Sequence, residues 1–138
     1  MRILAFVVVA LALVLRYVSA TAADERPQLT GVSTVRVANY GTPSTVIHDR
    51  ERVNAILGEL RRLRGKAWRR ADTKLSCYAT LALLNGSRPV TLFRISPEIV
   101  VERAQGKGQS SYSLDVARSD MPRTSALLAG IPPAKDCN

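Results

Sequence analysis

The chain begins with an uninterrupted apolar run, Ile3–Leu15, of thirteen residues. Arg2 precedes this run and the small residues Ala20-Thr21-Ala22 follow it, which is the three-part layout of a secretory signal peptide. The run is too short for a membrane span, which needs about 20 apolar residues. The pattern therefore predicts a cleavable signal peptide at residues 1–22 and export of the remainder. Arg16 leaves open the alternative that the segment is retained as an N-terminal anchor.

The most regular pattern of apolar residues follows Asp49. Asp49 is a good N-cap, and Glu51 lies in the first turn, where the helix dipole favours an acid. The apolar residues after it recur at i, i+3, i+4, i+7 and i+10, which predicts an amphipathic helix over residues 50–64 that ends at Gly65. The apolar stripe of this helix consists of Val53, Ile56, Leu57, Leu60 and Leu63.

Other segments alternate apolar and polar residues, as half-buried β-strands do. Asn85-Gly86 lies between two such segments and is a strong signal for a tight hairpin. A short helix is expected after Ser119 or Asp120, with Pro122 early in it and Gly130 at its end. The predicted strands are residues 32–40, 45–48, 75–84, 90–95, 99–103 and 111–116.

These elements fit one small domain. Their order, β-β-α-β-β-β-β-α, predicts an α+β fold in which the long helix covers one face of an antiparallel sheet. Removing residues 1–22 leaves 116 residues, enough for one core and too few for two. Residues 23–31 are polar and contain Pro27, so we expect a flexible leader there, followed by the domain at residues 32–138.

The layout resembles small exported bacterial domains of unknown function of the YhfM-like type. The resemblance covers residues 32–128 and implies a fold and an exported location, but no activity. It consists of Thr45–Asp49 before a capped helix, Ser76-Cys77-Tyr78 in a strand, the Asn85-Gly86 hairpin, Arg94-Ile95-Ser96 and, after a short turn, Tyr112-Ser113-Leu114.

The two cysteines, Cys77 and Cys137, are 60 positions apart. A lone pair of cysteines in an exported chain most simply forms one disulfide. Such a bond would fix a proline-containing tail that has little apolar surface to bury. The alternative is two unrelated free thiols.

The charge pattern points to an anionic partner. The full chain has a net charge of +9. Loss of Arg2 and Arg16 with the signal peptide leaves 18 basic against 11 acidic residues, a net charge of +7. A basic cluster around an aromatic residue suits a lipopolysaccharide, an acidic glycan, an anionic lipid surface or extracellular DNA. The alternative is a solvated helix face with the aromatic residue as a lid over the core. The cluster consists of Arg61, Arg62, Arg64, Lys66, Trp68, Arg69 and Arg70.

No residue pattern predicts catalysis. His48 is the only histidine and stands beside the capping residue Asp49, and a Gly-x-Ser-x-Gly motif is absent. Glu98 and Glu102 are expected to be solvated charges on a strand. One histidine and a cysteine pair are too few ligands for a metal site. We therefore predict no catalytic residue, no metal and no cofactor.

The sequence favours a non-catalytic exported binding domain, periplasmic or secreted, whose basic cluster meets an anionic polymer. One alternative is a protein-binding module, such as an enzyme inhibitor or a secretion accessory protein, that uses a sheet edge or the loop at 104–110 to contact an acidic protein. A small hydrolase that uses His48 is the last alternative.

Overall fold

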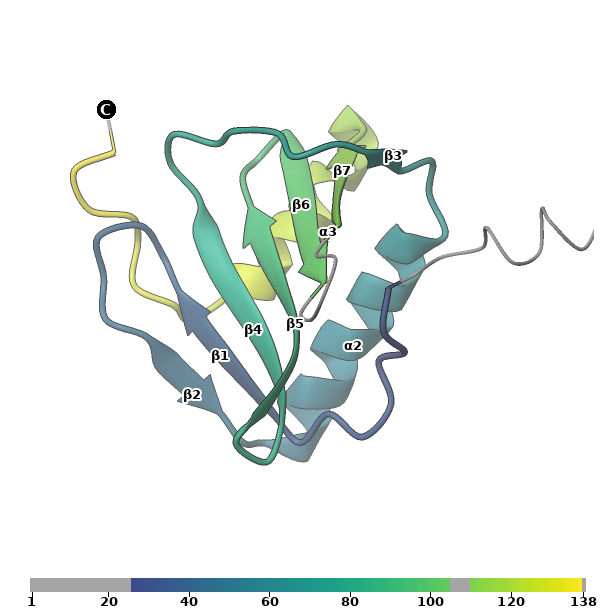
Figure 1. The fold of residues 1–138 in the computed structure, drawn as a ribbon. Coiled ribbons are helices and arrows are strands. Elements are labelled where there is room, and N and C mark those ends of the chain that lie inside the picture. Colours follow the sequence, from purple (N-terminus) through teal and green to yellow (C-terminus); the bar gives the residue numbers. More distant parts are fainter. Residues whose placement is uncertain (1–25, 105–109, 138) are drawn as a thin grey trace, which may run out of the picture.

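Seven segments pair side by side into one antiparallel sheet (Figure 1). The computed structural model describes residues 26–104 and 110–137. The strand order is β2-β1-β4-β5-β6-β7-β3, so β4 to β7 form a meander. This architecture confirms the predicted α+β fold. The strands are β1 (Thr34–Ala38), β2 (Thr45–Ile47), β3 (Arg69–Arg70), β4 (Ala79–Asn85), β5 (Arg88–Ile95), β6 (Ile99–Ala104) and β7 (Ser111–Asp115).

The long helix α2 (Arg50–Arg64) lies along one face of this sheet (Figure 1). The Asp49 carboxylate accepts a hydrogen bond of 2.9 Å from the backbone N–H of Arg52, and the helix ends at Gly65, as predicted. The five residues of the predicted stripe are all buried. The helix follows β2 at one sheet edge and leads to β3 at the other. With its two connections it therefore spans the whole width of the sheet.

The core lies between the sheet and α2. Side chains two apart on a strand point to the same face, and this alternation sends one set from each strand toward the helix. Burial of each large apolar side chain contributes about 1.5–3 kcal/mol to folding. The sheet contributes Val35, Val37, Leu81, Leu83, Phe93, Ile95, Val100 and Leu114 to this core.

The C-terminal helical segment consists of η1 (Arg118–Asp120), α3 (Met121–Ser125) and η2 (Ala126–Leu128). It packs beside α2 and buries Leu127 in the core. The predicted helix is present, but the predicted cap is not. Asp120 holds the N-cap position of α3 without a capping hydrogen bond, because its carboxylate pairs with Arg62 and Lys66 instead.

Two strand predictions need correction. The predicted strand 75–84 begins only at Ala79, because its neighbours on both sides end there: the pairing partners are Ala38 for Thr80 and Ile95 for Ala79. The two-residue strand β3 was not predicted, and it pairs with β7. The predicted signal peptide and residues 105–109 of the loop at 104–110 lie outside the described residues.

The predicted flexible leader is described from residue 26 onward, and this part is docked on the domain. Leu29 is 4% exposed and belongs to the core. The Pro27 carbonyl accepts a hydrogen bond of 2.6 Å from Arg64, and the Leu29 carbonyl accepts one of 3.0 Å from Arg61. The chain is therefore packed from Arg26 onward, five positions before the end of the expected leader.

The predicted disulfide between Cys77 and Cys137 is present, with the two Cα atoms 6.0 Å apart. It attaches the C-terminal tail beside the start of β4. The Lys135 N–H also donates a hydrogen bond of 2.8 Å to the Tyr40 carbonyl, which holds the tail against the turn between β1 and β2. Within the described part of the chain, no helix is long and apolar enough to cross a membrane.

Candidate functional site

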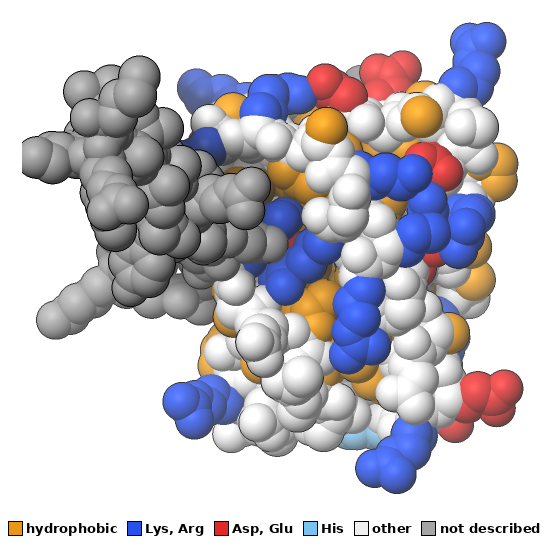
Figure 2. All heavy atoms as spheres, turned by 90° about the vertical axis from the view of Figure 1, so that its right-hand side faces the viewer, with side chains coloured by type: hydrophobic (Ala, Val, Ile, Leu, Met, Phe, Trp, Pro, Cys, Tyr) orange, Lys and Arg blue, Asp and Glu red, His pale blue; other side chains and the backbone are white. Residues whose placement is uncertain are grey.

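The predicted basic cluster runs from the last turns of α2 through the following loop to β3. Figure 2 shows that Lys and Arg side chains are spread over the side of the molecule that α2 forms, with apolar and acidic side chains between them. The cluster is therefore part of a dispersed basic surface. Its individual members differ in what they contact.

Arg62 and Lys66 both pair with Asp120, an acid that lies far away in the sequence. Arg62 bonds Glu59, one helical turn earlier, and Asp120 at 3.1 Å. Lys66 lies 3.8 Å from Asp120. The hydrogen bond to Glu59, with the charges of Glu59 and Asp120, raises the pKa of the Arg62 guanidinium. These two residues connect α2 to the C-terminal helices.

Arg64 was expected to face water, and the structure corrects this prediction. Its guanidinium forms a two-point ion pair with Glu102, whose side chain is completely buried. The Thr91 hydroxyl donates a further hydrogen bond of 3.0 Å to the same carboxylate. Glu102 was expected to be solvated, but it lies two positions from Val100 on β6 and so points to the face that α2 covers.

Trp68 packs against the core, and its Nε1–H donates a hydrogen bond of 2.6 Å to the Leu63 carbonyl. An indole held in this way covers the end of the α2 stripe. These contacts support the alternative of a core lid over that of a stacking platform for an anionic polymer.

The last member of the cluster, Arg70, borders a polar hollow at the β3–β7 edge. The Arg69 guanidinium pairs with Asp115, and the Arg70 guanidinium donates a hydrogen bond of 2.7 Å to the Ser110 hydroxyl. Arg103 faces the same hollow from β6. The hollow has a volume of about 340 Å³ and is lined by Arg70, Ala71, Asp72, Arg103, Ser110 and Ser111.

The electrostatics of this hollow favour an anion. Arg103 is exposed and has no carboxylate partner among the described residues. Asp72 is the one acid in the lining, and its carboxylate is bound at 2.7 Å by Arg94. Sequence reasoning missed Arg103, Ser110 and Ser111, because they reach Arg70 only through the pairing of β6 with β7 and of β7 with β3.

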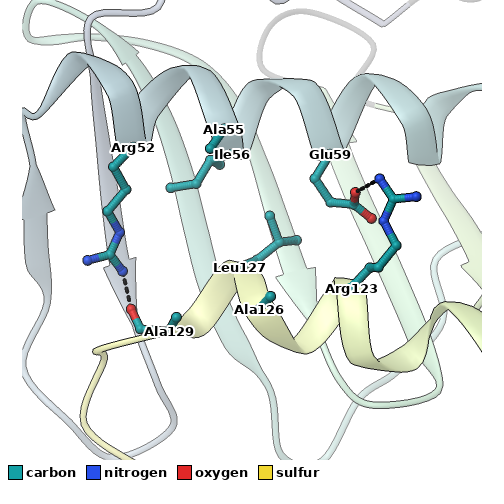
Figure 3. Close-up of a pocket in the computed structure, with 8 residues that line it drawn as sticks. All are labelled: Arg52, Ala55, Ile56, Glu59, Arg123, Ala126, Leu127 and Ala129. Carbon is teal, nitrogen blue, oxygen red and sulfur yellow. Dashed lines mark hydrogen bonds and ion pairs between the residues drawn. The ribbon is translucent and has the colours of Figure 1, made fainter.

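A second cavity, of about 370 Å³, lies between α2 and the C-terminal helices (Figure 3). Ile56 and Leu127 form its apolar middle, and Figure 3 shows an interaction of the chain itself at either end. Arg52 bonds the Ala129 carbonyl at one end, and Glu59 pairs with Arg123 at 3.1 Å at the other. The cavity is thus a gap between two packed helical segments, and the charged groups at its ends already bind one another or the backbone.

His48 lines a third hollow together with Ser33. The Ser33 hydroxyl accepts a hydrogen bond of 2.8 Å from the Gly86 N–H, and Asp49 caps α2. No hydrogen bond connects the described residues Ser33 and His48. The hollow therefore has the residue types of a hydrolytic site without the contacts that would activate a nucleophile.

No group of three or more histidine, cysteine, aspartate or glutamate residues within the described ranges could hold a metal ion. Comparison of the chain with protein-family models, with curated proteins and with solved structures found no match. The resemblance to YhfM-like domains stays a prediction.

Proposed function

We propose that this chain is an exported, non-catalytic accessory domain that binds an anionic polymer through the hollow at the β3–β7 edge. The observation that carries the proposal is Arg103, an exposed guanidinium without a carboxylate partner in the described structure, beside Arg70 and the Ser111 hydroxyl. Arginine matches the paired oxygens of phosphate, sulfate and carboxylate groups. Candidate partners are lipopolysaccharide phosphates, acidic glycans and extracellular DNA.

The proposed interface lies at the β3–β7 edge and excludes the part of the predicted cluster that belongs to α2. Arg62 and Arg64 hold α2 against other elements through ion pairs, so their removal would damage the fold as well as any interface. Among the described residues, the Arg103 side chain makes no such contact. Its replacement therefore tests binding with little effect on stability.

The test is retention on immobilised heparin, a sulfated polymer, during elution with a salt gradient. We expect Arg103→Gln to elute at clearly lower salt than the wild type, because one lost charge-assisted contact weakens binding by about tenfold. Arg50→Gln is the matched control. It removes the same charge from an exposed position at the start of α2 and should elute with the wild type.

Equal elution of the Arg103→Gln and Arg50→Gln variants would contradict the proposal. If Arg103→Gln does elute earlier, competition by free lipopolysaccharide, by a carboxylated glycan or by DNA identifies the preferred polymer. These experiments are done at low salt, because ion-pair binding to a polyanion weakens steeply with salt. Binding to an acidic protein but to none of the polymers would favour the protein-binding module instead.

A further inference from the structure

A guanidinium group lies in an aromatic cage near the end of α2. The Arg26 guanidinium carbon is 4.8 Å from the centre of the Trp68 ring and 5.0 Å from that of the Tyr112 ring. Its Nη1 atom is 3.5 Å from Glu102 Oε1. The Arg26 side chain is 6% exposed. Two aromatic rings and a buried carboxylate are groups that recognise a planar cation.

The walls of this cage are fixed by the body of the domain and do not depend on Arg26. Trp68 is held by its hydrogen bond to the Leu63 carbonyl. Tyr112 lies on β7, directly opposite Glu102 on β6. Glu102 is held by Arg64 and Thr91. The cage is therefore organised in advance for a cation, which lowers the cost of binding one.

The occupant comes from a segment with few attachments, residues 26–31, which we call the strap. Within the described structure, no backbone–backbone hydrogen bond connects the strap to the domain. Arg61 and Arg64 bind its carbonyl groups, and Leu29 is buried. Among the described residues, side chains of the domain thus hold the strap, as they would hold a bound peptide.

We propose that Trp68, Tyr112 and Glu102 form an arginine-binding pocket, which Arg26 fills in cis and an arginine of a binding partner fills when the strap is displaced. The ligand has the opposite charge to the polymer of the proposed function, and the two proposals stand or fall separately. A guanidinium stacks between two rings as a plane, so the pocket should prefer arginine to lysine.

Trp68 is the only tryptophan of the chain, so its fluorescence reports on the pocket directly. We expect purified Arg26→Ala protein to show a saturable fluorescence change with millimolar methylguanidinium at constant ionic strength. The wild type, with its pocket filled, should show no saturable change over the same range. Butylammonium should bind the Arg26→Ala variant at least about tenfold more weakly, because it cannot stack as a plane.

A second change tests the contribution of the Glu102 carboxylate to the pocket. Addition of Glu102→Gln to Arg26→Ala should weaken methylguanidinium binding by about tenfold or more, because a charge-assisted contact is lost. If far-UV circular dichroism shows that this variant is unfolded, Tyr112→Leu in the Arg26→Ala background tests the wall instead, with the same loss expected. Absence of a saturable response in Arg26→Ala, or an equal response in the wild type, would overturn the proposal.

Discussion

At the scale of single residues, the buried carboxylate of Glu102 is contacted from three other parts of the fold. It lies on β6, it is bound by Arg64 of α2 and Thr91 of β5, and it faces Arg26 of the strap. A buried ion pair gains little over well-packed apolar residues, but removal of one partner leaves a buried charge uncompensated. Glu102 should therefore tolerate substitution poorly.

We expect Glu102→Gln to lower the free energy of unfolding by about 3 kcal/mol, because Arg64 and Arg26 lose their buried counter-charge. Glu98→Gln is the control. Glu98 is exposed just before the same strand, and this change should stay within about 0.5 kcal/mol of the wild type. Urea unfolding followed by circular dichroism measures both. Similar midpoints for the two variants would show that the buried pair has no stabilising role.

A second residue-scale prediction concerns Gly41, which adopts a positive φ of 71°. A Cβ atom at this position would lie 2.7 Å from the Lys135 carbonyl oxygen of the tail. Gly41→Ala should therefore lower the free energy of unfolding by about 1–3 kcal/mol through backbone strain and this close contact.

Gly58→Ala is the control for this change, because a Cβ at Gly58 meets no atom within 4 Å and the position lies on α2. Alanine there should raise the free energy of unfolding by about 0.5–1 kcal/mol through its higher helix propensity. Thermal unfolding of both variants decides the matter. An unchanged Tm for Gly41→Ala would mean that the tail does not pack against this turn.

At the scale of elements, α2 is the part that the sequence predicts best. Its cap, its buried stripe and its last residue depend on contacts within a few positions, and the sequence displays these directly. The hairpin between β4 and β5 was predicted for the same reason, but Asn85 is the last residue of β4 and the two-residue turn is Gly86-Ser87. Gly86, at the first turn position, has a positive φ of 60°, which glycine adopts without strain.

The elements that the sequence missed depend on contacts across the fold. Nothing in the pair Arg69–Arg70 indicates a strand, because it becomes one only by pairing with β7. The partners of Arg62 and Arg64 lie 58 and 38 positions away. A charge pattern read along the chain therefore identified the basic residues but not which of them are already neutralised, and it could not locate the hollow around Arg103.

The disulfide links two elements, the C-terminal tail and the segment before β4, and its removal should lower stability. Cys137→Ala should lower the free energy of unfolding by roughly 2–4 kcal/mol, because the bond closes a loop of about 60 residues in the unfolded chain. Thiol titration of the unfolded wild type without a reductant should find no free thiol. Detection of two reactive thiols in native protein from its own host would show that the bond does not form there.

At the scale of the whole molecule, the positive net charge matches the polyanions that the chain would meet after the expected export. Seven excess positive charges on the chain expected after signal-peptide cleavage would attract polyanions from a distance, and salt at physiological strength screens this attraction over about 8 Å. The pairing of Arg62, Arg64 and Arg69 with carboxylates leaves much of that excess on other residues, Arg103 among them.

Processing of the N-terminus is the prediction at this scale. The Ala20-Thr21-Ala22 sequence predicts a mature chain that begins at Ala23 and so retains the whole strap with Arg26. Intact-mass measurement of the protein recovered from its own host checks this. A chain that still begins at Met1 and remains in the membrane fraction would support the retained anchor instead.

The position of the disulfide in the chain has a consequence for the order of folding. A polypeptide emerges from the ribosome N-terminus first at about 5–20 residues per second, so Cys137 follows Cys77 by about 3–12 s. Strands β4 to β7 all lie between the two cysteines. The residues of every strand are therefore synthesised before Cys77 has a partner in the chain. The disulfide thus cannot form before the sequence of the whole sheet is complete, and Cys77 remains an unpaired thiol until then.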